Sequence, residues 1–391
     1  MGIELTNEQV YAVYKMENWW NHRDKQIFEI SGSAGTGKSF IVRYLIEKLG
    51  LKYSNVLFCS FSGKAATLLS KNGLPAKTIH SAIYDYKEKV VRDEYGKLVL
   101  DERGYIKLKK EFELKPQLSK KIKLIVVDEA SMVNDKIGED LASFGIPIIA
   151  LGDLNQLPPV FGESYFLKNP DVILHKVMRQ AGDSPIVYLA QQILHGERLK
   201  YGVYGTSYVI NRNDLDDYKL KSADMIITGT NRTRYNINKY YRERFKNFKN
   251  LDFPHINEKV ICRKNNWDMC LDGKIYLTNG ISGFVEKVYR ESFNGRTLKI
   301  DFRPDFSKST FRNIYIDYKH LYAMPGAQED NNSWYYDKFE YAYAISVHVS
   351  QGSEFKKVLY IHENFMNNKE DEIKMMYTGI TRASESIGIV L

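Results

Sequence analysis

The sequence predicts an α/β fold with parallel sheets that are covered on both faces. Short apolar runs rich in β-branched residues alternate with helical stretches such as residues 40–49, the pattern of buried parallel strands and their connecting helices. The first runs are residues 27–30, 56–59, 124–127 and 146–151. Because open α/β sheets bind ligands at the carboxyl ends of their strands, we expect the loops after these runs to carry the function.

A second sheet of the same kind is predicted in the other half of the chain, from residues 225–228, 358–361 and 387–391. The segment between its strands has a different pattern, with alternating apolar and polar residues broken by Asn-Gly and Asp-Gly turns. This pattern predicts antiparallel strands at residues 260–262, 283–288, 298–302 and 314–316. We therefore expect a small all-β insertion in the second half.

A shorter insertion is predicted in the first half, where turn signals at residues 93–96 and 101–104 separate short alternating strands. Its charges nearly balance, which favours a projecting β-hairpin over a basic clamp. The predicted division is therefore a first lobe at 1–84 and 116–183, a hairpin at 85–115, a second lobe at 184–252 and 335–391, and an all-β insertion at 253–334.

Length and composition set the class of protein. The 391 residues suffice for two domains, and 43% apolar with 27% charged residues argues against a disordered chain. No apolar segment is long enough to cross a bilayer, the N-terminus lacks a signal-peptide pattern, and the three cysteines show no metal-ligand spacing. We expect a cytoplasmic protein, and a net charge of +8 suits a polyanionic partner.

The basic charge is concentrated in residues 231–250, where seven Lys and Arg residues face one acid and aromatic residues lie between them. Such a segment is typical either of a nucleic-acid-binding surface or of a solvated helix whose aromatic residues face the core. The sequence alone favours neither.

Residues 32–39 match the phosphate-binding pattern Gly-x-x-x-x-Gly-Lys-Ser between a predicted strand and a predicted helix. The glycines allow backbone N–H groups, here those of Gly35, Thr36 and Gly37, to surround phosphate oxygens at a helix N-terminus. Lys38 would neutralise the β- and γ-phosphates, and Ser39 would coordinate Mg²⁺.

Two further segments supply the groups that hydrolysis of a triphosphate needs. Asp128 follows a buried strand, where its carboxylate can face a magnesium ion, and Glu129 can orient or deprotonate the attacking water. Gln156 lies after the next strand, and its amide can contact both the γ-phosphate and that water. Arg179 and Arg382 are the candidates for stabilising charge in the transition state.

Taken together, these segments resemble a superfamily 1 helicase, and their details resemble the RecD and Dda branch, superfamily 1B. The marks of that branch are Gly-Asp-x-x-Gln-Leu-Pro-Pro-Val at 152–160, Gly-Lys-Ala-Ala at 63–66, Thr-Ile-His at 78–80, Met-Arg-Gln at 178–180, Ser-Gln-Gly-Ser-Glu-Phe at 350–355 and Thr-Arg-Ala at 381–383. The resemblance covers nearly the whole chain, beginning with Leu-Thr-x-x-Gln at 5–9.

The resemblance implies two RecA-like P-loop lobes with ATP and Mg²⁺ in the cleft between them. Gln9 would read the adenine, and Gly352, Glu354 and Arg382 would approach the nucleotide from the second lobe. It also implies that the first insertion is a pin that splits duplex DNA and that the second is a small β-barrel. Tyr95 or Tyr105 near the hairpin turns could divide the duplex, or both could be packing residues of the pin.

The resemblance further implies that single-stranded DNA crosses both lobes and that its phosphates contact Lys64, Thr78, His80, His348 and Ser350. Outside these motifs, both histidines would be read as capping or core residues. The chain departs from the family at Val349, where a basic residue is usual, and at Met178, where an aromatic residue often precedes the arginine. Loss of a basic residue at 349 predicts mildly weaker DNA binding with less salt dependence.

We therefore expect an ATP-dependent helicase that moves 5′ to 3′ on single-stranded DNA, acts at single-strand/duplex junctions and works as a monomer. The alternative within enzymes is a translocase that displaces bound proteins and unwinds poorly. The intact motifs argue against a binding protein with an inactive site, and a small-molecule kinase would not need the segments around Gln351 and Arg382. Replication or recombination proteins are the partners expected of a compact phage or bacterial enzyme of this kind.

Overall fold

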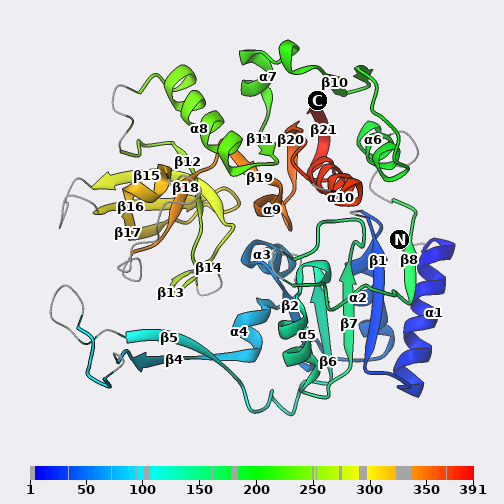
Figure 1. Ribbon diagram of the computed structural model, residues 1–391. Helices are drawn as coiled ribbons and strands as arrows, with labels where there is room; N and C mark the ends of the chain where they lie inside the picture. Colours follow the sequence, from blue (N-terminus) through cyan, green and yellow to red (C-terminus); the bar gives the residue numbers. More distant parts are fainter. Residues whose placement is uncertain are drawn as a thin grey trace.

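The computed structural model describes residues 5–33, 35–71, 73–92, 95–100, 106, 108–159, 162–177, 184–248, 251, 253–272, 275–289, 297–322, 336–366 and 368–391. Figure 1 shows two α/β lobes stacked on each other, an antiparallel sheet beside the second lobe and a long hairpin that projects from the first. In the described residues, no helix is both long and apolar enough to cross a membrane.

The first lobe is built on a parallel sheet with strand order β3-β2-β6-β7-β1-β8 in the described residues. Its strands are β1 (Ile27–Gly32), β2 (Val56–Ser60), β3 (Ala76–Thr78), β6 (Leu124–Asp128), β7 (Ile148–Gly152) and β8 (Val172–Leu174). Its helical segments are α1 (Asn7–His22), α2 (Lys38–Lys48), η1 (Tyr53–Asn55), α3 (Gly63–Lys71), α4 (Ile79–Ile83), η2 (Ala130–Met132) and α5 (Asp135–Ala142). Separate apolar clusters cover the two faces of this sheet, as predicted from its continuous apolar strands.

The second lobe has a mixed sheet with strand order β19-β11-β20-β21-β10-β9 in the described residues, and only the β9–β10 pair is antiparallel. The strands are β9 (Gly202–Tyr204), β10 (Ser207–Ile210), β11 (Met225–Thr228), β19 (Ala344–Ser346), β20 (Phe355–Ile361) and β21 (Ala383–Val390). The helical segments are α6 (Pro185–Leu194), η3 (Arg212–Asp214), α7 (Asp217–Ser222), α8 (Asn231–Phe245), α9 (Val347–Ser350) and α10 (Lys369–Ile380). The predicted strands at 225–228, 358–361 and 387–391 are confirmed to within a few residues.

The insertion in the second lobe is an antiparallel sheet with strand order β17-β16-β15-β12-β18. Its strands are β12 (Lys259–Cys262), β15 (Ser282–Tyr289), β16 (Thr297–Pro304), β17 (Phe311–Asp317) and β18 (Phe339–Tyr341), with a separate pair β13 (Asn266–Leu271) and β14 (Ile275–Leu277) and a short helix η4 (Tyr318–Tyr322). A single bridge joins Ile316 in β17 to Asp337 just before β18, so the two edges of the sheet approach each other. Continuous hydrogen bonding around a closed barrel is not seen in the described residues.

The projecting hairpin consists of β4 (Tyr84–Val90) and β5 (Leu108–Leu114), which pair in antiparallel register. Its base is fixed to the first lobe, because the hydroxyl of Tyr84 donates to Asp140 at 2.5 Å and the ammonium of Lys115 donates to the Ala82 carbonyl at 2.9 Å. Near the far end, the Tyr95 side chain is 81% exposed, whereas Tyr105 lies outside the described residues. The hairpin thus carries an exposed aromatic ring well away from the lobe.

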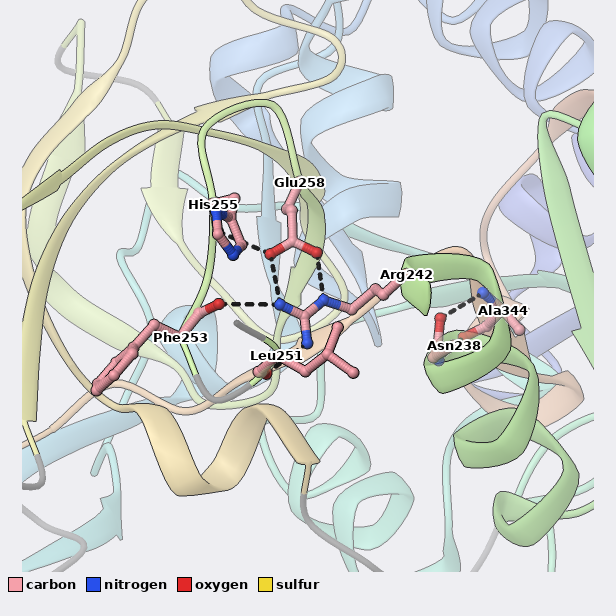
Figure 2. Close-up of polar contacts among 7 residues, drawn as sticks. All are labelled: Asn238, Arg242, Leu251, Phe253, His255, Glu258 and Ala344. Carbon is pink, nitrogen blue, oxygen red and sulfur yellow. Dashed lines mark hydrogen bonds and ion pairs between the residues drawn. The ribbon is translucent and has the colours of Figure 1, made fainter. Parts of the chain in front are cut away.

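The buried arginines of the basic helix α8 form contacts within the protein. Arg242 is completely buried and forms hydrogen bonds with the Glu258 carboxylate and with the carbonyls of Leu251 and Phe253 (Figure 2). Arg234 is 6% exposed and pairs with Glu340 at 2.7 Å. These two arginines join α8 to the antiparallel insertion and are not available to a nucleic acid.

Candidate functional site

The site predicted from the sequence forms where three adjacent strands of the first sheet end. β6, β7 and β1 are neighbours, and they end at Asp128, Gly152 and Gly32. The loop after β1 leads directly into α2, whose N-cap Gly37 has a φ of 88°. That left-handed conformation and the φ of 84° at Gly35 are suited to glycine, so the backbone can turn its N–H groups toward a phosphate.

Lys38 lies at the start of α2, and its ammonium donates to the carbonyls of Gly32 and Ser33 at 2.5 and 3.0 Å. The ammonium is therefore held within the loop that matches the phosphate-binding pattern. A phosphate group placed at this helix N-terminus would meet both the backbone N–H groups and this cation.

Gln9 is brought to the same loop by α1. Its side chain is 4% exposed and its amide donates to the Thr36 carbonyl at 3.1 Å. A Cβ atom on Gly37 would lie 2.5 Å from the Gln9 amide nitrogen, so a larger residue there would displace the Gln9 side chain as well as strain the backbone at φ 88°. A capping box between Thr6 and Gln9 fixes the start of α1 and with it the position of this side chain.

Asp128 and Glu129 lie at the end of β6, beside α2. The Ser39 side chain lies near the Asp128 carboxylate, and Lys38 is close enough to attract that carboxylate. Burial, reinforced by the neighbouring Glu129 carboxylate, raises the pKa of Asp128 to about 6. Glu129 adopts a left-handed conformation with φ 55°, which turns the chain sharply away from the strand into η2.

These residues also fit the Mg²⁺ ion that the motif implies. The Asp128 carboxylate and the Ser39 hydroxyl are oxygen donors of the kind Mg²⁺ prefers, and they lie together next to the phosphate-binding loop. A cation would relieve the repulsion between the carboxylates of Asp128 and Glu129. In the described residues, no group of three or more His, Cys, Asp and Glu side chains forms a separate metal site.

Gln156 is held in a turn that follows β7. Asp153 organises this turn, because its carboxylate accepts the Asn155 N–H at 3.0 Å and lies 3.5 Å from the Gln156 amide nitrogen. The Gln156 side chain is 6% exposed, and its buried carbonyl oxygen has no hydrogen-bond partner among the residues that the structure describes. An orphaned buried acceptor of this kind suits a side chain that binds a water molecule or a substrate group.

Second-lobe side chains reach this turn directly. The Thr378 hydroxyl on α10 accepts the Leu157 N–H at 2.9 Å, and the Gln351 amide donates to the Leu157 carbonyl at 2.9 Å. The Leu157 side chain is itself buried in the apolar cluster of the second lobe. The two lobes are therefore joined at the residue that follows Gln156.

Sequence reasoning missed a further contact between the lobes, made by Tyr377. Its side chain is 1% exposed, and its hydroxyl lies 2.8 Å from Ser33 Oγ and 2.8 Å from Asp153 Oδ2. Burial and the Asp153 carboxylate raise the pKa of Tyr377 well above its ordinary value, so the hydroxyl keeps its proton. The sequence did mark Tyr377 as the first residue of the last motif. The motif alone, however, does not indicate which residues the Tyr377 hydroxyl contacts.

The candidate arginines are placed differently from the other site residues. Arg382 is 4% exposed, and its guanidinium donates to the carbonyls of Thr378 and Ser353 at 3.0 and 3.3 Å, within its own lobe. Arg179 lies outside the described residues. Glu354 is exposed, while Gly352 contacts the first lobe so closely that a Cβ there would lie 2.9 Å from Ser62 Oγ.

The side chains expected to contact DNA lie along the seam between α3, α4 and α9. Lys64 is 7% exposed, and its ammonium lies 4.6 Å from the centre of the Phe355 ring in the second lobe. Thr78 caps α4, and Ser350 is completely buried with its hydroxyl donating to the Val347 carbonyl. In this conformation the Ser350 hydroxyl does not reach solvent, and the Lys64 side chain is largely buried.

The two histidines of this seam are partly buried. His80 packs among the rings of Phe61, Tyr84 and Phe112, with ring centres 5.5 to 6.5 Å away. Burial lowers the pKa values of both His80 and His348, so both favour the neutral imidazole. A neutral histidine can still donate one hydrogen bond to a phosphate.

Two protein families match parts of the chain. Residues 19–162 match the family described as an AAA domain, and residues 341–390 match the UvrD-like helicase C-terminal domain. These two segments contain most of the motifs that converge at the site.

Curated relatives align with the chain over limited segments. It is 31% identical over 184 residues to the ATP-dependent RecD2 DNA helicase of Deinococcus radiodurans, covering 44% of this chain and 22% of that protein. It is 29% identical over 181 residues to the ATP-dependent DNA helicase dda of Enterobacteria phage T4, covering 43% of this chain and 38% of that protein. A longer alignment, 23% identical over 461 residues, covers 93% of this chain and 36% of the uncharacterized protein MJ1519 of Methanocaldococcus jannaschii. The chain therefore spans well under half the length of these relatives.

Solved structures share the fold over the whole chain. A Pif1 structure from a study of unwinding at forked double-stranded DNA by two coordinating helicases superposes with a TM-score of 0.57 at 18% identity, covering 99% of this chain and 92% of that one. Bacteroides Pif1 bound to single-stranded DNA gives 0.55 at 16% identity, with coverages of 99% and 92%. Pif1 from Candida albicans gives 0.54 at 17% identity, with coverages of 100% and 94%.

Proposed function

Because the chain belongs to the superfamily 1B DNA helicases of the Pif1, RecD and Dda class, we propose that it is an ATP-dependent helicase that moves 5′ to 3′ along single-stranded DNA. In this proposal the lobes close and open with each ATP, and the hairpin formed by β4 and β5 separates the duplex. The single observation that carries the proposal is the junction at Leu157.

The junction links hydrolysis to movement. The turn that holds Gln156 continues into Leu157, whose N–H and C=O are both bonded to second-lobe side chains. A shift of Gln156 on loss of the γ-phosphate therefore acts on α10 and on the segment of Gln351 through hydrogen bonds, without a flexible linker between them. A contact of this kind between packed lobes, if ATP binding and release switch it between two arrangements, would convert ligand binding into a rigid-body displacement.

Each first-lobe residue has a role that follows from its position. Lys38 and the N–H groups of the loop would bind the β- and γ-phosphates, and Ser39 with Asp128 would hold Mg²⁺. Bound there, Mg²⁺ would supply positive charge that neutralises the negative charge developing on the phosphates. Glu129 would take a proton from the attacking water, which the free carbonyl oxygen of Gln156 would orient.

The second lobe would complete the site when the lobes close. The Arg382 guanidinium would give up its hydrogen bonds to the carbonyls of Thr378 and Ser353. It would form hydrogen bonds with phosphate oxygens in their place. Gly352 and Glu354 would approach the nucleotide at the same time, and Arg179 is the second candidate cation. Gln9, already beside the loop, would read the base.

DNA would bind along the seam that carries Lys64, Thr78, His80, His348 and Ser350. Because Lys64 and Ser350 are buried in the present arrangement, the seam would have to widen before their polar groups could contact phosphates. Sequence-independent contacts of this kind suit translocation, since every step meets the same backbone. Replication or recombination proteins are the proposed partners, and a single chain holds one complete set of motifs.

The energy needed for unwinding is compatible with a small step, such as one base pair for each ATP. Separating one base pair requires about 1.4 kcal/mol of stacking free energy on average, which one cycle of ATP hydrolysis can supply. The exposed ring of Tyr95 near the tip of the hairpin is suited to stack against the first pair.

The test is unwinding of a duplex that carries a single-stranded tail at either its 5′ or its 3′ end, with ATP and Mg²⁺. The proposal predicts unwinding from the 5′ tail only. Equal or exclusive unwinding from the 3′ tail would contradict the polarity. DNA-stimulated hydrolysis without unwinding from either tail would instead identify a translocase that displaces bound proteins.

A further inference from the structure

The Tyr377 hydroxyl forms a three-membered hydrogen-bond chain between the lobes. Tyr377 lies on α10 of the second lobe, whereas its partners Ser33 and Asp153 follow β1 and β7 of the first. Both contacts measure 2.8 Å, and the pair Ser33–Tyr377 joins residues 344 positions apart. One hydroxyl of the second lobe thus contacts both the phosphate-binding loop and the turn that holds Gln156.

The direction of the chain follows from the chemistry of its members. A phenol has one proton and a carboxylate can only accept, so Tyr377 donates to Asp153. The same phenolic oxygen then accepts from the Ser33 hydroxyl. Ser33 therefore donates to Tyr377, and Tyr377 donates to Asp153. Each hydroxyl uses its single proton within this chain.

The Ser33 end of this chain lies beside the cation that would bind phosphate. The Ser33 carbonyl accepts hydrogen bonds from the Lys38 ammonium at 3.0 Å and from the Thr36 hydroxyl at 2.9 Å. A phosphate that takes this ammonium would withdraw one of these bonds from Ser33. The Ser33 side chain would keep its contact with Tyr377 of the second lobe.

The Asp153 end controls the turn that carries Gln156. One carboxylate oxygen accepts the Asn155 N–H, and the other, which Tyr377 holds, lies 3.5 Å from the Gln156 amide nitrogen. Moving Tyr377 would therefore shift the Asp153 carboxylate and change both its distance from the Gln156 amide and the electrostatic field there. The chain thus runs from the phosphate-binding loop, through the second lobe, back to the side chain proposed to orient water.

We propose that Tyr377 is a positioning residue that couples occupancy of the phosphate-binding loop, through Ser33 and Asp153, to the placement of Gln156 by the second lobe. This inference rests on the proposed function, because it assigns DNA-dependent control of hydrolysis to this chain of contacts. DNA bound across both lobes would set the position of α10, and Tyr377 would report that position to Gln156.

The experiment compares ATP hydrolysis with and without single-stranded DNA in the full chain carrying Tyr377→Phe, Ser33→Ala or both. The phenylalanine keeps the ring and removes only the hydroxyl. We expect Tyr377→Phe to lower the ratio of DNA-stimulated to DNA-free kcat by about five- to tenfold, with KM for ATP changed by less than about twofold. Ser33→Ala should lower the same ratio, and the double variant should lose no more than the larger single loss.

The matched control is Tyr360→Phe. Tyr360 is also fully buried in the second lobe, but within the described parts of the chain its hydroxyl has no hydrogen-bond partner. We expect its stimulation ratio to equal that of the wild type. A wild-type ratio in Tyr377→Phe, or losses that multiply in the double variant, would overturn the proposed coupling.

Failure of the inference and failure of the proposed function give different results. A wild-type chain that hydrolyses ATP without any response to DNA contradicts the function. In that event, the coupling is tested by the rise in melting temperature that a non-hydrolysable ATP analogue with Mg²⁺ produces. The coupling predicts a smaller rise in Tyr377→Phe than in Tyr360→Phe, and equal rises would contradict it.

Discussion

The guanidinium of Arg242 and the carboxylate of Glu258 are both completely buried and hydrogen-bonded to each other, at the junction of α8 with the antiparallel insertion. The ring of Tyr341 covers the guanidinium, with 4.0 Å between the guanidinium carbon and the ring centre. Glu258 also accepts the His255 N–H at 2.7 Å, so the charges of both partners are satisfied without water (Figure 2). This pair fixes the insertion to the second lobe.

Removing one member of this pair should destabilise the protein strongly. We expect Arg242→Met to lower the free energy of unfolding of the second lobe by about 3–5 kcal/mol, because it leaves a buried carboxylate without a counter-charge. Adding Glu258→Leu should recover part of this loss. Urea denaturation measures both, with Arg244→Met on the exposed face of the same helix as a control that changes little. Equal stability of Arg242→Met and Arg244→Met would contradict the argument.

Lys38 should be essential for hydrolysis. Lys38→Ala removes the cation from the phosphate-binding loop, and we expect kcat for ATP to fall by about a hundredfold to a thousandfold. Lys48→Ala is the control, because Lys48 ends the same helix and forms an exposed pair with Glu17. The assignment of the loop fails if the two variants hydrolyse ATP at similar rates.

Glu129 should act in the chemical step and not in binding. Glu129→Gln keeps the shape of the side chain and removes its ability to accept a proton, so kcat should fall by about 10²–10⁴. The dissociation constant of a non-hydrolysable ATP analogue should change little. Glu139→Gln on the exposed side of α5 controls for the loss of one negative charge. A large loss of analogue affinity in Glu129→Gln would assign the residue to binding.

The partly buried His80 should make stability depend on pH. Burial lowers the pKa of His80 below its ordinary value of 6.5, so the unfolded chain binds a proton more tightly than the folded one. Its contribution is complete above about pH 6.5 and is lost as pH falls through the window below that value. We expect the free energy of unfolding to fall less between pH 7.5 and 5.5 in His80→Phe than in the wild type. The exposed His195→Gln should retain the wild-type fall, and an unchanged fall in His80→Phe would contradict this account.

The sequence predicted the parts of this protein that depend on local patterns. Continuous apolar runs marked the strands of both sheets, and the rule that parallel strands end at one edge brought Lys38, Asp128 and Gln156 together. The antiparallel strands of both insertions were also predicted from alternation and turns.

The remaining features depend on how the lobes meet. Local patterns could not show that Tyr377 reaches Ser33 or that Lys64 lies against Phe355, because these contacts join segments from different lobes. The basic pattern of α8 was ambiguous for a related reason, since the partners of its buried arginines lie outside the helix, in the insertion of the same lobe. Arg234 and Arg242 belong to the interior only because Glu340 and Glu258 come to them from the insertion.

The most direct test of the account is the rate of ATP hydrolysis by the wild-type chain with and without single-stranded DNA, at saturating ATP and Mg²⁺. Since the Leu157 junction ties the nucleotide site to both lobes, DNA bound across the lobes should raise kcat by about tenfold or more, and Lys38→Ala should abolish the rate in both conditions. A rate that depends on Lys38 but does not respond to DNA would contradict the central claim.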